Sequence, residues 1–151
     1  MTTATSFQIP PPIQAEHEAL HAQLRAATRA PGEVGQAALD VARLLHPHFV
    51  REEEFALPPL ALLAPLARGE VQGLADVLPM TRRLKAELPA MLAEHQQIVG
   101  ALEKLRRAAR GAGLDEHVRF ADALILHAQT EEAVLYPAAL LVGEVAELRS
   151  R

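Results

Sequence analysis

The segment His48-Phe49-Val50-Arg51-Glu52-Glu53 recurs 79 positions later as His127-Ala128-Gln129-Thr130-Glu131-Glu132. Residues four apart on an α-helix lie about 40° apart around its axis, so the His and the first Glu of each segment share one helical face. Imidazole and carboxylate groups both bind metal ions. The two segments therefore predict two halves of one metal site, held inside a single all-helical bundle.

Residues outside these segments repeat as well. Glu16-His17 is matched by Glu94-His95, 78 positions later. Prolines recur six residues after each paired Glu and six residues before each lone His, at Pro58, Pro137, Pro11 and Pro89. Self-similarity at a nearly fixed offset indicates one structural unit that occurs twice. We therefore predict two successive helical hairpins, each carrying one lone His and one His-x-x-x-Glu pair.

The composition supports a helical, globular chain. Its 151 residues are the length of one domain, and half of them are hydrophobic, mostly Ala and Leu, which favour helix over strand. The absence of cysteine excludes disulfides, Cys-type zinc sites, iron–sulfur ligation and thiol catalysis.

Charge and hydropathy limit the partners. The formal net charge is -4, and the basic side chains lack the interleaved aromatics that would favour nucleic acid. No apolar run approaches the roughly 20 residues of a membrane span, and the N-terminus does not resemble a signal peptide. We expect a soluble cytoplasmic protein with no nucleic-acid or membrane partner.

Helix-breaking residues and hydrophobic periodicity indicate where the helices begin and end. We expect an extended N-terminal arm over residues 1–12 and a helical bundle over 13–151. Pro47 predicts a kink just before His48, and Pro89 a bend in the third helix. The predicted helices cover about residues 13–29, 33–56, 80–110 and 114–136, with a last helical piece over 138–149 and a connection over 57–79 that contains one or two short helices.

The ligand count indicates two metal ions. Six protein ligands would saturate a single ion, whereas two carboxylates that each bridge two ions, with an oxo or hydroxo bridge, leave about one open position per ion. Mixed imidazole and carboxylate ligation with open positions suits non-haem iron, with manganese possible, while zinc prefers four ligands. The predicted metal ligands are His17, His48, Glu52, His95, His127 and Glu131.

This pattern resembles the H…HxxxE…H…HxxxE pattern of hemerythrin-like proteins, the HHE cation-binding family, over about residues 13–141. The resemblance includes the downstream Pro58 and Tyr136-Pro137. It implies an up-down four-helix bundle around a di-iron centre that binds small molecules such as dioxygen, peroxide or nitric oxide. It also implies that the four histidines are terminal ligands and that Glu52 and Glu131 are the bridges.

One position departs from the family pattern. Oxygen-carrying hemerythrins have a fifth His four residues before the lone His of the third helix, where this chain has Met91. His21 instead stands four residues after His17, on the same predicted helical face. A fifth His ligand would suit reversible oxygen binding. Without one, both ions stay accessible, which suits reaction with peroxide or nitric oxide, or iron handling.

Three functions therefore stay open at the predicted centre. The first is a carrier or sensor that takes up a small diatomic ligand such as dioxygen. The second is an enzyme that acts on peroxide or nitric oxide, so the sequence leaves open whether the protein is an enzyme. The third is iron storage or delivery.

Two other metal motifs fit less well. His17-Glu18-Ala19-Leu20-His21 matches the HExxH helix of zinc hydrolases, in which the Glu is a general base. The motif occurs in one repeat only, and no strand is predicted for a peptide substrate to pair with. A ferritin-like di-iron site needs Glu-x-x-His on two helices, and only Glu18-x-x-His21 fits.

The remaining polar residues near the motifs receive weaker assignments. We expect His46 and His117 to be exposed, because both lie off the predicted ligand face. Packing is the expected role of Tyr136, with lining of the pocket entrance as the alternative. Glu53 and Glu132 are expected either to face solvent or to orient the ligand imidazoles.

Overall fold

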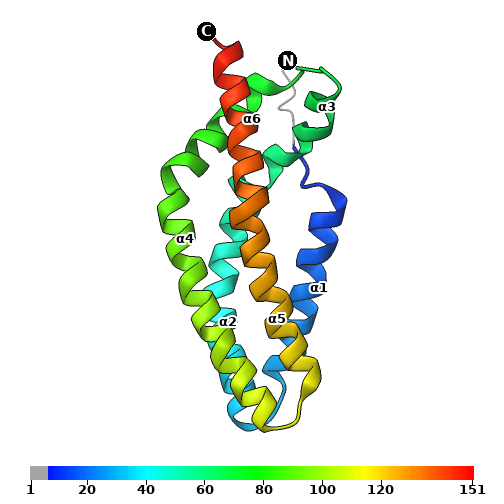
Figure 1. Cartoon of the computed structure of the whole chain (residues 1–151), viewed down its shortest axis with the longest axis vertical. Coiled ribbons are helices and arrows are strands. Elements are labelled where there is room, and N and C mark those ends of the chain that lie inside the picture. Colours follow the sequence, from blue (N-terminus) through cyan, green and yellow to red (C-terminus); the bar gives the residue numbers. More distant parts are fainter. Residues whose placement is uncertain (1–6) are drawn as a thin grey trace.

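The computed structural model describes residues 7–151, and within that range the chain is helical with no strand. The predicted arm over residues 1–12 lies partly outside the described residues. Figure 1 shows the order of the elements. They are α1 (Pro11–Thr28), α2 (Gly32–Arg51), the π-helical turn η1 (Glu52–Ala56), the 3-10 turn η2 (Pro58–Leu62), α3 (Leu63–Ala67), α4 (Leu74–Gly111), α5 (Asp115–Thr130), a second π-helical turn η3 (Glu131–Leu135) and α6 (Tyr136–Arg149).

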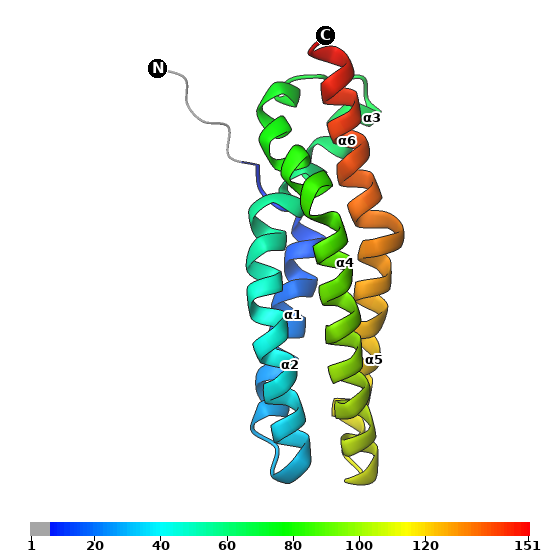
Figure 2. The same cartoon turned by 90° about the vertical axis from the view of Figure 1, so that its left-hand side faces the viewer.

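Four long helical rods form an up-down bundle (Figures 1 and 2). A short turn joins α1 to α2, and another joins α4 to α5 at the same end of the bundle. α2 packs against α1 and α4, and α5 packs against α4 and α1, which closes the ring of four. The predicted all-α four-helix bundle of two helical hairpins is therefore confirmed.

The third long helix begins earlier than the sequence predicts. We expected the connection to extend to Pro79, but α4 starts at Leu74, directly after Gly73, whose positive φ of 83° suits glycine. Pro79 lies in the second turn of the helix. The side chains of Leu74, Val77 and Leu78 are buried in a cluster with α6, and this tertiary burial outweighs the missing proline N–H.

The two His-x-x-x-Glu helices change their winding at the Glu. Both Glu52 and Glu131 begin a π-helical turn, in which the hydrogen bonds span five residues instead of four. The proline six residues after each Glu, Pro58 or Pro137, has no N–H to continue an α-helical ladder, which accounts for the interruption at both places. The second turn leads directly into α6, so the piece predicted over 138–149 is continuous with α5 (Figure 1).

Two apolar clusters lie on either side of the histidines along the bundle axis. One, toward the end with the short turns, includes Leu20, Leu45 and Ile98. The other, toward the opposite end, includes Leu57 and Met91. In sequence, His17, His95 and His127 each fall between residues of the two clusters, and His48 lies at the end of the first cluster, shortly before the second begins at Phe55. The polar residues therefore form a layer enclosed by hydrophobic packing at both ends.

Candidate metal centre

The bundle brings all six predicted ligands into this buried layer. They come from α1, α2, η1, α4, α5 and η3, and each is at most 3% exposed. They form two groups whose donor atoms are close enough to hold a metal ion. We call them the His48 cluster, which comprises His48, Glu52, His95 and Glu131, and the His17 cluster, which comprises His17, His127 and Glu131.

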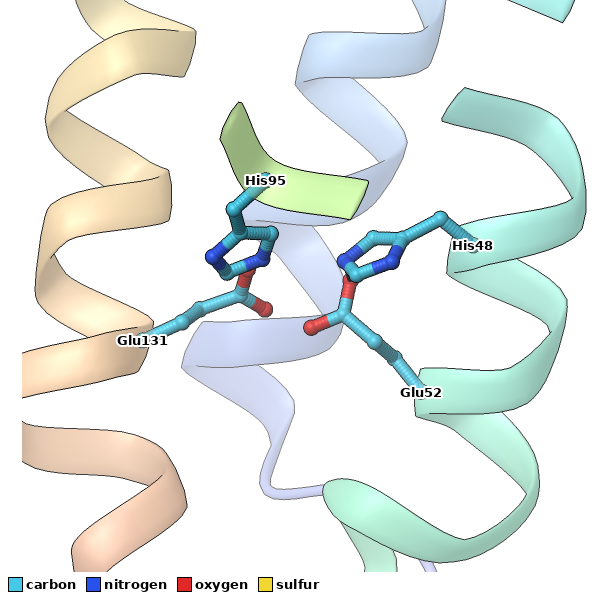
Figure 3. Close-up of side chains that lie close together, drawn as sticks. All are labelled: His48, Glu52, His95 and Glu131. Carbon is cyan, nitrogen blue, oxygen red and sulfur yellow. Dashed lines mark ion pairs between the residues drawn. The ribbon is translucent and has the colours of Figure 1, made fainter. Parts of the chain in front are cut away.

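The His48 cluster joins the two hairpins. Figure 3 shows its four side chains pointing toward one another from α2, η1, α4 and η3. Nε2 of His48 lies 3.2 Å from Oε1 of Glu52. Nε2 of His95 lies 3.2 Å from Oε1 of Glu131. Two imidazole nitrogens and two carboxylates thus converge on one small volume.

The His17 cluster shares Glu131 with its neighbour. Nε2 of His17 and Nε2 of His127 are 3.1 Å apart, and they lie 3.8 and 3.3 Å from Oε2 of Glu131. Oε1 of the same carboxylate faces the His48 cluster. Glu131 therefore spans both clusters, which is the placement that a bridging carboxylate requires. Glu52 belongs to the His48 cluster alone, and bridging by Glu52 stays a prediction.

A carboxylate faces the Nδ1 atom of every one of these imidazoles. His48 donates to Glu94 and His95 to Glu132, each across 3.0 Å. His127 donates to Glu16, and Nδ1 of His17 lies 3.6 Å from Oε1 of Glu53. The hydrogen bonds of His48, His95 and His127 fix the orientation of these rings and leave Nε2 with its lone pair directed at the cluster. Nδ1 of His17 is buried without a hydrogen-bond partner, so Glu53 contributes only a nearby charge.

These four carboxylates were only half anticipated from the sequence. Orientation of the imidazoles was one of two roles considered for Glu53 and Glu132, which are partly exposed and also contact His17 and His95. The contribution of Glu16 and Glu94 was missed. The repeat could have drawn attention to them, since each directly precedes a lone His in the sequence. The histidine that each contacts, however, belongs to the other hairpin, and the sequence does not indicate that pairing.

Arg51 supports one of these contacts. Its guanidinium donates to both carboxylate oxygens of Glu94, 2.6 Å from Oε2, and lies 3.2 Å from Sδ of Met91. Glu94 in turn accepts from His48. Met91 is thus a buried thioether that contacts the Arg51–Glu94 ion pair, and Glu94 of this pair contacts His48.

Burial and the close approach of the two central carboxyls shift their pKa values in opposite directions. Burial, together with the charge of Glu131, raises the pKa of Glu52 to about 8. Burial also acts to raise the pKa of Glu131, but Glu52 and the surrounding imidazoles outweigh it and hold that pKa well below its usual range. Burial disfavours the charged form of His127, yet Glu131 and Glu16 raise its pKa to about 9.

This centre fits a cation. Oε1 of Glu52 and Oε2 of Glu131 are buried without a hydrogen-bond partner, a costly state that a bound ion would relieve. Two adjacent buried carboxyls cannot both ionise cheaply without positive charge between them. Four imidazole Nε2 atoms face the same space. The donor set of imidazole and carboxylate suits a divalent or trivalent transition metal.

Aromatic rings enclose the donors. The hydroxyl of Tyr136 is buried and donates to Oε2 of Glu52 across 2.9 Å, so this residue has a polar role at the centre in addition to the packing expected of it. Burial and the charges of Glu52 and Glu131 raise its pKa above the usual range. Phe49 stacks on His17 with ring centroids 4.2 Å apart.

The remaining histidines lie outside both clusters. His21 is partly buried and packs edge-on against Phe49, and neither group of candidate ligands in residues 7–151 includes it. His46 is exposed, as predicted. The prediction that His117 is exposed is wrong: it shares the buried face of α5 with Phe120 and Leu124, because that face is wider than the line of ligands.

Fold and site together define a four-helix bundle protein with buried His and Glu clusters that are suited to hold a cation. The model of the Hemerythrin HHE cation binding domain family matches residues 13–139, and the chain belongs to this family. No match was found among curated proteins or among solved structures. No helix within residues 7–151 combines the length and the hydropathy needed to cross a membrane.

Proposed function

We propose that the chain is a non-haem di-iron protein that binds a small ligand such as dioxygen in the bundle core, as a carrier or sensor. The observation that carries this proposal is the placement of Glu131, whose two oxygens face two separate groups of imidazoles. A carboxylate in that position is suited to link two ions. His17, His48, Glu52, His95, His127 and Glu131 are the proposed ligands.

The donor set favours iron. Imidazole and carboxylate together suit non-haem iron, and manganese is the nearest alternative. Bound iron would supply a change of oxidation state and open coordination positions for the small ligand, with an oxo or hydroxo bridge completing the pair. The protein contributes orientation, through the carboxylates that accept from Nδ1 of His48, His95 and His127, and exclusion of bulk water, through the apolar clusters at both ends.

A surface pocket adjoins one of the proposed ligands. A surface pocket of about 320 Å³ lies between α4 and α5, and its lining includes His95, Gly100, Gln129 and Glu132. His95 is itself a proposed ligand. The glycine leaves the pocket open at a point where a larger side chain would narrow it. The pocket therefore reaches the protein surface beside the His48 cluster.

One observation favours the second candidate, an enzyme that acts on peroxide or nitric oxide. Met91 replaces the fifth histidine of oxygen carriers, and His21 stands outside both clusters. Fewer protein ligands leave more positions open for a reactive small molecule. Iron storage or delivery would use the same residues, with iron as the cargo.

The HExxH zinc hydrolase alternative gains no support from the geometry. Within residues 7–151, no group of candidate ligands contains both His17 and His21. Glu18, the base in that reading, is exposed and accepts a hydrogen bond from Gln14.

Elemental analysis and visible spectroscopy test the proposal. The purified protein should contain about two irons per chain, the number that the two clusters accommodate. Anaerobic reduction followed by air should give a charge-transfer band that disappears when oxygen is removed. Turnover of added peroxide or nitric oxide would instead support the enzyme, and a single zinc per chain would overturn the di-iron proposal.

A further inference from the structure

The hydroxyl of Tyr136 faces the same atoms that a metal ion in the His48 cluster would face. It lies 2.9 Å from Oε2 of Glu52, 3.2 Å from Nε2 of His95 and 3.4 Å from Nε2 of His48. The carboxylates that orient the imidazoles contact their Nδ1 atoms, on the far side of each ring. Tyr136 therefore differs from those residues, because its oxygen lies on the donor side.

The distances match those between neighbouring ligands of one ion. Metal bonds of about 2.1 Å to nitrogen and oxygen place adjacent ligands of an octahedral ion about 3.0 Å apart. The separations within the His48 cluster, 3.2 Å from His48 to Glu52 and 3.2 Å from His95 to Glu131, are close to this value. The contacts of Tyr136 are of the same length, so its oxygen lies where a further ligand would lie.

Tyr136 also breaks the internal symmetry of the chain. At the offset of 79 that relates the two His-x-x-x-Glu segments, its counterpart in the first repeat is Leu57. Leu57 is fully buried and has no donor atom. Conversely, Phe49 stacks on His17, whereas its counterpart Ala128 has no ring. The two clusters therefore differ, with a phenol at the His48 cluster and a hydrocarbon ring at the His17 cluster.

We propose that the phenol oxygen of Tyr136 is a ligand of the metal ion in the His48 cluster, and that the small ligand binds the ion in the His17 cluster. This inference rests on the proposed metal centre. The first ion would then have five protein residues as ligands and the second three, with Glu131 shared. Binding of the cation displaces the phenolic proton, which is released to solvent. Tyr136 thereby supplies the closing ligand that neither Met91 nor His21 provides.

The composition of the chain makes this inference directly measurable. Tyr136 is the only tyrosine, and there is no tryptophan, so every change in phenol absorbance comes from this residue. Metal-free protein should be titrated with Ga³⁺, a colourless trivalent ion, while its near-ultraviolet difference spectrum is recorded. We expect a phenolate signal that saturates at one phenolate per chain. Uptake of Ga³⁺ without any phenolate signal would overturn the inference.

The Tyr136→Phe variant provides the matched control, since it keeps the ring that stacks on His95 with centroids 5.5 Å apart and removes only the oxygen. In the air-oxidised iron protein, the wild type should show a phenolate-to-iron band in the visible and in resonance Raman spectra, and the variant should lose it at equal iron content. Identical spectra would contradict ligation by Tyr136.

Azide binding tests which ion is open. The wild type should bind one azide per chain, whereas Tyr136→Phe should bind a second one at the position that the phenol has vacated. Equal azide stoichiometry would contradict the assignment of the open position. The two proposals fail separately: an iron content well below two per chain overturns the di-iron centre, whereas two irons without a phenolate signal overturn only the role of Tyr136.

Discussion

Glu94 accepts a hydrogen bond from Nδ1 of His48 across 3.0 Å, although it adjoins a different candidate ligand, His95, in the sequence. Glu16 has the equivalent relation to His127. In both cases the residue before a lone His on one hairpin orients the paired His on the other hairpin. The two hairpins thus contact each other through the side chains of the candidate metal centre as well as through the apolar core.

Replacing Glu94 with Gln should weaken metal binding by about 10- to 100-fold, because a neutral amide orients the His48 ring less firmly and lowers its basicity. The affinity is measured by competition with a chromophoric chelator. Glu54→Gln serves as control, since this exposed carboxylate pairs with Arg83 at the surface. Unchanged affinity in Glu94→Gln would show that the contact has no influence on the metal.

Replacing Glu131 with Ala should reduce the metal content more than replacing Glu52 with Ala, because only Glu131 faces both clusters. The loss of metal should also lower thermal stability. At free metal about 100 times its Kd, the wild type gains about 2.7 kcal/mol that the variant lacks. Mass spectrometry of the metals and calorimetry check both effects.

His46→Ala is the matched histidine control for His127→Ala. His46 is exposed, whereas His127 is 3% exposed and lies in the His17 cluster. The first variant should retain wild-type metal content and the second should lose metal. Equal metal content in the two variants would refute the assignment of His127 as a ligand.

Replacing His21 with Ala should leave the metal content and the visible spectrum unchanged, because His21 packs against Phe49 and belongs to neither cluster. A small loss of stability from the lost ring contact is the expected effect. A shifted charge-transfer band at constant iron content would instead show that His21 reaches the metal when it is bound.

The metal-free protein should become less stable as pH rises from about 5 to 9. The folded-state pKa values of Glu52, about 8, and His127, about 9, exceed the ordinary values of 4.5 and 6.5. Both groups therefore hold more protons in the folded state than in the unfolded state over this range. His127 alone contributes roughly 3 kcal/mol below pH 6.5, which is lost as pH rises through 9.

Below about pH 5, the stability of the metal-free protein should change with pH in the opposite direction. The lowered pKa of Glu131 contributes stability above pH 4.5 that is lost as pH falls further. Metal-free stability should thus be greatest near pH 5, and urea unfolding across pH 4 to 9 measures it. Because metal binding requires deprotonated ligands, the increase in Tm on adding metal should grow with pH. A metal-free stability that rises steadily from pH 5 to 9 would contradict these shifts.

Gly143→Ala should destabilise the fold by about 1–3 kcal/mol through overpacking. A Cβ atom at this position would lie 2.6 Å from Cβ of Thr81, where α6 approaches α4 closely. Gly100→Ala is the control: it also lies within a helix but has open space around its Cβ position, so the better helix propensity of Ala should stabilise by up to about 1 kcal/mol. Chemical unfolding measures both variants.

The sequence by itself determined the helices, the duplication and the six candidate ligands. These features depend on local spacing: a His and a Glu four apart share a face in any α-helix, and a repeat at a fixed offset carries the same unit twice. The prolines after Glu52 and Glu131 were visible as a repeat, although their consequence, a π-helical turn at each Glu, was not predicted.

Only the tertiary structure decided which residues meet across helices. The pairing of His17 with His127, the reach of Glu94 to His48 and the approach of Tyr136 to Glu52 all join residues more than 40 positions apart. Such contacts depend on how far each helix is rotated about its axis and how closely it packs, and sequence periodicity does not specify either. The same packing buried His117, because the width of a helix's buried face is set by its neighbours.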